Sequence, residues 1–248
     1  MKYSRITTIL FFPAMLLLLV PGVFFLLPAH IEATEISTST LSEDVYPNTD
    51  QPVDDITTHG QADYLNDIEK EVVLHLNMAR TDPGRYAAKF IKPRIRYFAG
   101  KRYREPWQSA SFVGYRTHEG KKAVHECIAV MESTLPIKRL LPSKGLSLAA
   151  KDHARFQSRT GRIGHRGPDG SKPGTRLRQH YNWRITGENI SYGLNTAREI
   201  VACLLVDDGV HSRGHRSIIL DPQFSIVGVA IERHPLHRYV CVINFAGN

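Results

Sequence analysis

The chain has 248 residues, of which 42% are hydrophobic, and 32 Lys and Arg against 24 Asp and Glu give it a formal net charge of +8. The apolar fraction excludes a wholly disordered chain, and three cysteines exclude a disulfide-rich scaffold. Residues 34–63 contain seven acidic residues and no Lys or Arg. We therefore expect an N-terminal export segment (1–33), an acidic tether (34–62) and one folded domain (63–248).

The export segment begins with Lys2 and Arg5, which precede an apolar run over residues 9–28. This order is typical of a signal peptide, with cleavage expected near Ala29 or Ala33. The run also approaches the roughly 20 residues that span a bilayer, so an uncleaved signal-anchor stays an alternative. Both interpretations predict that the folded domain is secreted or otherwise extracytoplasmic. The polar tether that follows has too few apolar residues to offset chain entropy and is expected to be flexible.

The folded domain shows helical periodicity first and strand patterns late. Asp63 is predicted to cap a first helix that runs to about Arg80. Further helices are predicted over residues 119–133 and 143–160, near Pro173, and over residues 196–206. Strands are predicted over residues 185–192, 226–232 and 239–245. Because helices and strands do not alternate regularly, we expect an α+β sandwich with a largely antiparallel sheet.

Residues 89–116 are predicted to be irregular, and basic and aromatic side chains alternate over residues 89–107. The basic residues are Lys89, Lys92, Arg94, Arg96, Lys101, Arg102 and Arg104, and the aromatic ones are Phe90, Tyr97, Phe98, Tyr103 and Trp107. This segment can contact anionic lipid headgroups or wall polymers, and a solvated surface with inward aromatic rings is the alternative. Nucleic acid is not an expected partner, because no nucleic-acid motif is present and export removes the domain from it.

Four short stretches place ionisable side chains beside glycine or a turn. They are Gly164–Gly170, Gly187–Ser191, Asp207–Val210 and Arg213–Arg216. Polar residues on such turns more often line clefts than fill cores. We therefore expect these side chains to line a cleft rather than to fill the core.

The ordered combination of these stretches with Leu76–Arg80 and Leu146–His153 resembles the CAP superfamily (cysteine-rich secretory proteins, antigen 5, pathogenesis-related 1). The resemblance runs over roughly residues 65–247 and is to the cysteine-poor form typical of bacterial secreted proteins. It implies a three-layer α–β–α sandwich with a mainly antiparallel central sheet. It also implies a cleft that contains two histidines and two acidic residues.

By position, the resemblance assigns His165 as the first histidine of the cleft, Glu188 as the acid of the Gly-Glu-Asn motif and His215 as the second histidine. The family's second acid lies three residues after a Trp that Leu205 replaces here. Counting three residues on from Leu205 favours Asp208 as that acid, and its neighbour Asp207 stays an alternative. His211 adds a further imidazole at the i,i+4 spacing from His215.

The chemistry of this tetrad follows from its side chains. Neutral imidazoles bind Zn²⁺ or another divalent cation, and two histidines with waters would form an exchangeable site that the carboxylates orient. Without metal, the same groups can carry out acid–base catalysis. Because the four stretches contain no recognisable nucleophile, we favour a non-enzymatic binding module. The family resemblance implies a lipid, surface-polymer or protein ligand for it. The alternative is a metal- or acid/base-dependent extracellular hydrolase of peptide, glycan or ester bonds. Neither HExxH nor GxSxG occurs in the sequence.

Other candidate residues have structural interpretations. His153 lies on an apolar helical face and is expected to be a core histidine rather than a ligand. Cys127, Cys203 and Cys241 lie in apolar elements. Buried free thiols are favoured over a Cys203–Cys241 disulfide. Contact with a membrane is expected only through the N-terminal segment, if it is uncleaved, or weakly through Lys89–Arg104.

Overall fold

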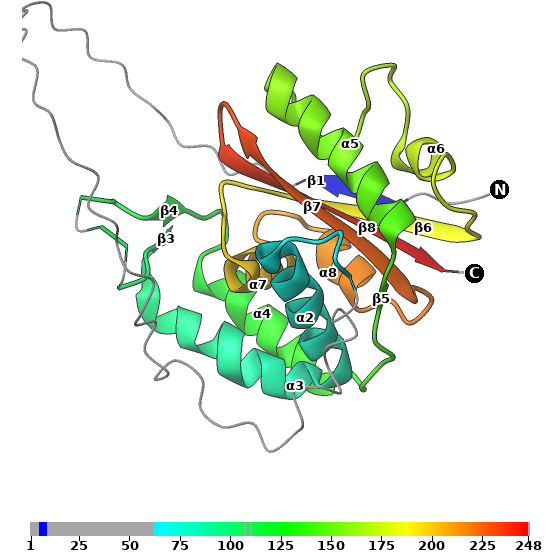
Figure 1. The fold of residues 1–248 in the computed structure, drawn as a ribbon. Helices are drawn as coiled ribbons and strands as arrows, with labels where there is room; N and C mark the ends of the chain where they lie inside the picture. The colour runs from blue at the N-terminus through cyan, green and yellow to red at the C-terminus, as the bar shows by residue number, and fades with distance from the viewer. Residues whose placement is uncertain (1–4, 9–61, 107, 110, 248) are drawn as a thin grey trace, which may run out of the picture.

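The central sheet has five strands in the order β1-β6-β8-β7-β5. The computed structural model describes residues 5–8, 62–106, 108–109 and 111–247 (Figure 1). The strands are β1 (Arg5–Thr8), β5 (Leu141–Pro142), β6 (Ile185–Tyr192), β7 (Ile226–His234) and β8 (Arg238–Gly247). The three long strands β6, β8 and β7 pair antiparallel, whereas β1 and β5 are parallel to their neighbours. The predicted, mainly antiparallel sheet is confirmed.

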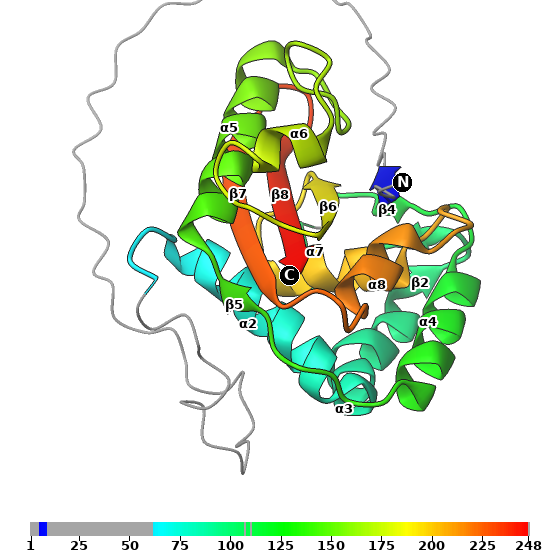
Figure 2. The same ribbon diagram turned by 90° about the vertical axis from the view of Figure 1, so that its right-hand side faces the viewer.

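Helices cover both faces of the sheet (Figures 1 and 2). One face carries α5 (Lys144–Thr160) and α6 (Pro173–Leu177). The other layer contains α2 (Asp67–Thr81), α3 (Pro83–Tyr86), α4 (Lys121–Ser133), α7 (Ala197–Val206) and α8 (Gly214–Ile219). The largest cluster of buried apolar side chains lies between this second layer and the sheet. The fold is therefore the expected three-layer α–β–α sandwich.

The first helix begins later than predicted. Asn66, not Asp63, caps α2, because its side chain accepts from the Glu69 amide (3.0 Å) while the Glu69 carboxylate accepts from the Asn66 amide (2.9 Å). This reciprocal capping box satisfies two backbone donors that the helix leaves unpaired. Each of the other predicted helices begins within two residues of its predicted start. Ser143 caps α5, and Thr196 caps α7.

Helix α5 crosses β7 at Gly228 with almost no space between the backbones. A Cβ atom at Gly228 would lie 2.2 Å from the carbonyl carbon of Leu146 and from the amide nitrogen of Ser147. We expect Gly228→Ala to lower the free energy of unfolding by about 1–3 kcal/mol or more, since either the helix or the strand must move. Urea denaturation measures this, and Gly84→Ala, whose Cβ meets only one atom 4.0 Å away, is the control. Equal losses in both variants would contradict the close packing.

The basic–aromatic segment is more regular than predicted. It forms a π-helical turn η2 (Ala87–Ile91), a 3-10 helix η3 (Lys92–Tyr97) and a small sheet of β2 (Phe98–Ala99), β3 (Arg102–Tyr103) and β4 (Tyr115–Arg116). One of its basic side chains turns inward. The Arg94 Nη1 atom lies 2.8 Å from both carboxylate oxygens of Glu199, and the guanidinium stacks 4.4 Å from the Tyr103 ring. Arg94 is therefore unavailable to an external polyanion.

Glu105 lies beside this ion pair, is 3% exposed and accepts a hydrogen bond from the Tyr103 hydroxyl (2.8 Å). Burial, then the nearby charge of Glu199, raises the pKa of Glu105 from 4.5 to about 7. The folded chain therefore holds this proton more tightly than the unfolded chain. Stability should fall as the pH rises from about 4.5 to about 7. Urea midpoints at pH 5 and pH 8 should differ less in Glu105→Gln than in the wild type; an unchanged difference would contradict this assignment.

Part of the predicted export segment lies in the sheet, because Arg5–Thr8 form β1. The apolar run over residues 9–28 and the acidic tether, apart from Ala62, lie outside the described residues. Signal cleavage, anchoring and a flexible tether therefore stay predictions. Among the residues that the structure describes, none of the helices is both long and apolar enough to cross a membrane.

Candidate functional site

The first half of the candidate site is a buried pair between His165 and Glu188. His165 lies in the loop between α5 and α6, and Glu188 lies on β6. His165 Nδ1 is 2.8 Å from Glu188 Oε1, and Arg176 Nη2 donates to Glu188 Oε2 at 2.7 Å. Burial alone would raise the pKa of Glu188, but the His165 hydrogen bond and the Arg176 charge hold it below its ordinary value. Both carboxylate oxygens therefore position neighbouring side chains.

Arg176 on α6 is a site residue that the sequence did not reveal. Besides Glu188, its guanidinium donates to the carbonyl oxygens of His165 (2.8 Å) and Ser171 (3.0 Å). It therefore fixes the path of the histidine loop as well as the charge of the acid. A buried carboxylate indicates a cationic partner, but no spacing in the sequence distinguishes Arg176 from neighbouring basic residues.

The loop is also held one residue before His165. The Gly164 amide donates to the Tyr192 hydroxyl (2.8 Å), and the Gln157 amide donates to the Gly164 carbonyl oxygen (2.7 Å). His153 Nε2 lies 2.9 Å from the same oxygen. Burial is the main cause that lowers the pKa of His153. His153 is thus a buried histidine that contacts the main chain, in agreement with the core interpretation.

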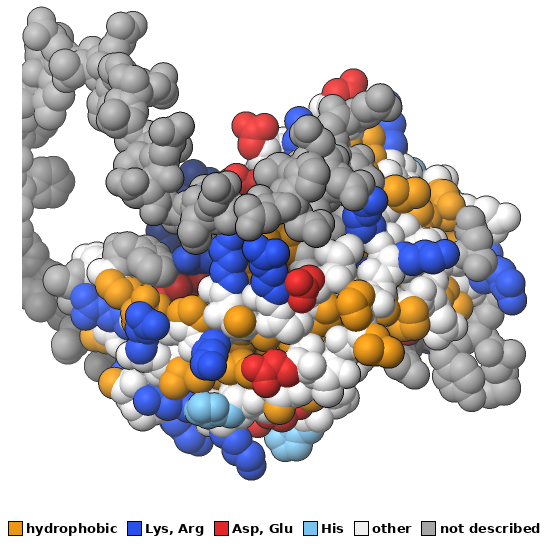
Figure 3. Space-filling view, turned by 90° about the horizontal axis from the view of Figure 1, so that it is seen from below, with side chains coloured by type: hydrophobic (Ala, Val, Ile, Leu, Met, Phe, Trp, Pro, Cys, Tyr) orange, Lys and Arg blue, Asp and Glu red, His pale blue; other side chains and the backbone are white. Residues whose placement is uncertain are grey.

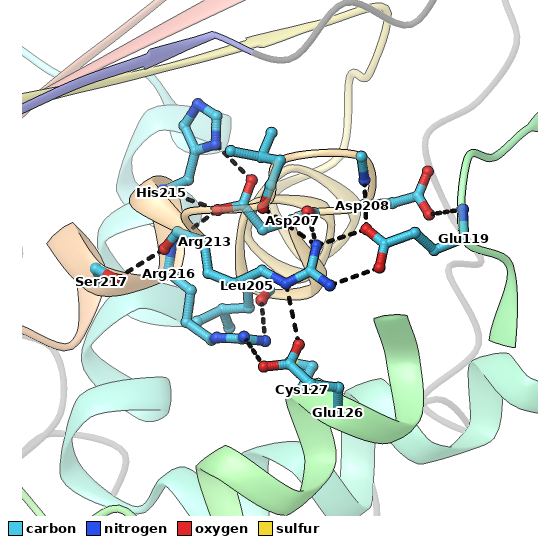
Figure 4. A network of polar contacts seen from close by, with 12 residues as sticks. Glu119, Glu126, Cys127, Leu205, Asp207, Asp208, Arg213, His215, Arg216 and Ser217 are labelled. Carbon is cyan, nitrogen blue, oxygen red and sulfur yellow. Dashed lines mark hydrogen bonds and ion pairs between the residues drawn. The ribbon is translucent and has the colours of Figure 1, made fainter. Parts of the chain in front are cut away.

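The second half is a pair between His215 and Asp207 (Figure 4). Asp207 Oδ1 lies 2.6 Å from His215 Nδ1, and Asp207 Oδ2 accepts from the His215 amide at 2.9 Å. Asp208, which the sequence favoured, instead accepts from the amides of His118 (2.6 Å) and Glu119 (2.8 Å) just before α4. The carboxylate that pairs with His215 is therefore that of Asp207, which corrects the preference for Asp208.

The physical reason is the backbone at the end of α7. The helix ends at Val206, and Asp207 has a left-handed conformation with φ of 55°. A count of three residues from Leu205 assumes that the helix continues through Asp208. Because the helix ends two residues before Asp208, Asp207 takes the place beside the imidazole, and Asp208 accepts from the amides of His118 and Glu119 instead.

Arginine–carboxylate pairs tie the start of α8, the helix that carries His215, to α4 and to Glu119 just before it (Figure 4). Arg213 Nη1 and Nη2 each lie 2.7 Å from one oxygen of Glu119, and Nη1 also donates to the Asp207 carbonyl oxygen at 2.7 Å. The Arg213 hydrogen bonds lower the pKa of Glu119 to about 2. Arg216 pairs with Glu126, which lies on α4. These contacts hold the turn between α7 and α8 against the helical layer.

The two histidine–carboxylate pairs approach β6 from opposite faces. Successive side chains of a strand alternate in direction. Glu188 faces α6 and meets His165, whereas the next residue, Asn189, donates its side-chain amide to the His215 carbonyl oxygen at 3.1 Å on the α8 side. One ion that touched both imidazoles would therefore lie around the edge of β6 that pairs with β1.

His215 has the orientation of a metal ligand. A neutral His215 ring that donates Nδ1–H to the Asp207 carboxylate leaves the lone pair of Nε2 available to a ligand. This Nε2 atom is buried and has no hydrogen-bond partner. In Figure 4 the ring turns Nδ1 toward Asp207 and its other nitrogen away from the polar network. An unpartnered acceptor of this kind fits a cation, which is the group that the family resemblance implies.

The described part of the chain contains no group of three or more His, Cys, Asp or Glu side chains arranged to hold a metal. A site here would therefore have two imidazoles and solvent as ligands. His211 is exposed in the turn before α8, which begins only at Gly214, so His211 and His215 do not share a helical face. Direct ligation by His211 with His215 is not supported by this placement.

The sequence model of the cysteine-rich secretory protein family, CAP, matches residues 98–245, more than half of the chain. The chain belongs to the CAP family. The helical motif Leu76–Arg80, which precedes the matched residues, is structural. Asn77 exchanges two hydrogen bonds with the Leu140 backbone (2.8 and 3.1 Å), and Arg80 donates to four main-chain carbonyl groups.

Solved structures with a related fold come from bacteria. An extracellular protein containing a SCP domain from Bacillus anthracis is 23% identical, with a TM-score of 0.36 over 45% of this chain and 35% of that chain. An outer surface protein from Borrelia burgdorferi is 18% identical, with a TM-score of 0.39 over 45% of this chain and 80% of that chain. A cysteine-rich secretory protein from Staphylococcus aureus is 14% identical, with a TM-score of 0.37 over 59% and 46%.

The CAP chain thus spans about a third of the length of the Bacillus protein and about half of the Staphylococcus protein. No curated protein matches the chain.

Proposed function

We propose that this chain is an extracellular, non-enzymatic CAP-domain binding module that holds a divalent cation such as Zn²⁺ with His165 and His215. The observation that carries the proposal is the buried Nε2 atom of His215, which has no hydrogen-bond partner while Asp207 holds Nδ1. Metal-binding histidines typically donate their other ring nitrogen to a carboxylate in this way.

His165 likewise places its Nδ1 atom 2.8 Å from a carboxylate oxygen, that of Glu188, on the other face of β6. Two imidazoles with water as the remaining ligands form an open site, which exchanges ligands more readily than a closed structural site. The bound ion would supply a Lewis-acidic centre to which a carboxylate or phosphate group of a partner can bind. The protein's own residues orient the imidazoles, and the His165 hydrogen bond with the Arg176 charge keeps the pKa of Glu188 below its ordinary value.

The contacts of the two acids favour binding over hydrolysis. The Glu188 carboxylate contacts the His165 ring and the Arg176 guanidinium. The Asp207 carboxylate contacts the ring and the backbone amide of His215. Neither acid has an oxygen free of these partners to act as a general acid on a substrate. The contacts of the described residues therefore give the hydrolase alternative no specific support.

For the wider partner, we propose an anionic lipid, surface polymer or protein that docks on Lys89–Arg104, with Arg94 excluded because it is buried. In Figure 3, basic side chains spread among hydrophobic ones over the face that includes the α2–α4 layer, and acidic ones are fewer. Binding through this face should weaken steeply between 50 mM and 500 mM salt. A vesicle co-sedimentation assay with and without anionic lipid measures this, and salt-independent binding would contradict an electrostatic contact.

Calorimetric Zn²⁺ titration tests the metal proposal. His165→Ala and His215→Ala should each weaken binding at least tenfold, and Asp207→Asn should weaken it by about 10–100-fold because the ring loses its orienting partner. His180→Ala is a matched control, since His180 also contacts a carboxylate, that of Asp152 at 3.2 Å, but at an exposed position. The titration should include a chain that lacks residues 2–8, because β1 lines the edge of β6. Equal affinities in all variants would remove the proposal.

A further inference from the structure

Strand β6 has the properties of a sheet edge that needs a partner. Seven of its eight residues are buried, and its sequence, ITGENISY, contains neither Pro nor Lys. Its one charged side chain, Glu188, points inward and is paired. Natural edge strands are usually protected from pairing by charges, prolines, bulges or short length. β6 lacks such protection and offers an extended row of backbone donors and acceptors.

In this chain the edge is occupied by β1. Arg5–Thr8 pair in parallel with β6, with Arg5 opposite Gly187 and Thr8 opposite Ile190. β1 lies beside α8, which carries His215, and Figure 4 shows its blue ribbon next to the yellow ribbon of β6. The occupied stretch thus contains Glu188, whose carboxylate contacts the His165 ring, and Asn189, whose side-chain amide contacts the His215 carbonyl oxygen.

We propose that the edge of β6 over residues 187–190 is a strand-acceptor site that binds an extended polypeptide in parallel register, with Arg5–Thr8 as its own resident strand. Main-chain pairing provides the affinity in this mode of recognition, so the ligand is a peptide segment rather than a lipid or glycan. The predicted cleavage near Ala29 or Ala33 would remove the resident strand and leave the edge open to an extended segment of a partner protein. This inference does not depend on metal binding.

Hydrogen exchange of the full chain tests the resident contact. Proline lacks an amide proton and does not fit a paired strand, so Ile6→Pro should displace β1. We expect at least tenfold faster exchange at the β6 amides that face β1 and unchanged exchange in β7 and β8, whose mutual pairing is retained. Ile6→Val is the control and should exchange like the wild type. Unchanged exchange of β6 in Ile6→Pro would overturn the proposal for the resident strand.

Peptide binding tests the acceptor site itself. A labelled peptide with the sequence of residues 1–8, MKYSRITT, should bind saturably to the chain from which residues 2–8 are deleted and should restore slow exchange to β6. The same peptide with proline at the isoleucine position should not bind. Absence of both binding and renewed protection would overturn the acceptor proposal. Zn²⁺ titration of the same chain is a separate readout, so failure of one proposal is distinguishable from failure of the other.

Discussion

Glu188→Gln should lower the free energy of unfolding by about 3–5 kcal/mol near neutral pH, because it leaves the Arg176 cation buried without its anion. Glu188 is 1% exposed, and its two oxygens lie 2.8 Å from His165 Nδ1 and 2.7 Å from Arg176 Nη2. An amide of the same shape keeps the volume but loses the charge and presents a donor to one of these donors. Chemical denaturation with urea measures the loss.

The pH dependence gives this prediction a second readout. The pKa of Glu188 is lowered in the folded chain, so its contribution to stability is present above its ordinary value of 4.5 and is lost as the pH falls through the still lower folded pKa. The difference between wild type and Glu188→Gln should therefore shrink in acid. Glu232→Gln is the control, because Glu232 pairs with Arg155 at the surface at 3.4 Å and should cost less than about 1 kcal/mol. A loss of similar size in both variants would contradict the role of Glu188.

Arg80→Met should have a comparable effect, with a loss of at least about 3 kcal/mol, because buried carbonyl groups would lose charged donors. Arg80 is fully buried and donates to the carbonyl oxygens of Lys138 (2.9 Å), Ile219 (2.6 Å), Asp221 (3.0 Å) and Phe224 (2.8 Å). It thereby joins α2 to the segment between α8 and β7 and to the approach to β5.

The matched control for this variant is Arg85→Met. Arg85 is exposed on α3, so its replacement should change the free energy of unfolding by less than about 0.5 kcal/mol. Thermal and urea unfolding of both variants should give the same ranking. If Arg80→Met unfolds at the same urea concentration as Arg85→Met, the four carbonyl contacts do not carry the stability that we assign to them.

Features that depend on local pattern were predictable from the sequence. The strand β6 has the bounds that its β-branched residues and flanking turns predicted, and the start of α5 follows from Ser143 as its cap. His165 and Glu188, which were placed by resemblance alone, form a direct contact. These features depend on residues that are close in sequence or on the order of motifs along the chain. Both can be read from a single amino-acid sequence.

Features that depend on side-chain packing or on a single backbone angle were not predictable. Asp207 replaces Asp208 beside His215 because φ at Asp207 is positive, which a residue count cannot show. Arg176 and Arg94 are basic residues in polar segments, and only the folded chain brings them to buried carboxylates. The parallel pairing of β1 with β6 joins residues that are about 180 positions apart, and no local pattern indicates it.

The central claim is that His165 and His215 share one cation at the edge of β6. Diffraction from Zn²⁺-soaked crystals, recorded on both sides of the zinc absorption edge, tests this claim most directly. We predict one anomalous peak at about 2.0–2.1 Å from Nε2 of both histidines, the usual distance from zinc to an imidazole nitrogen. The peak should be absent in His215→Ala. An anomalous peak only at another position would contradict the claim. So would the absence of a peak near His215 in crystals of the protein that lacks residues 2–8.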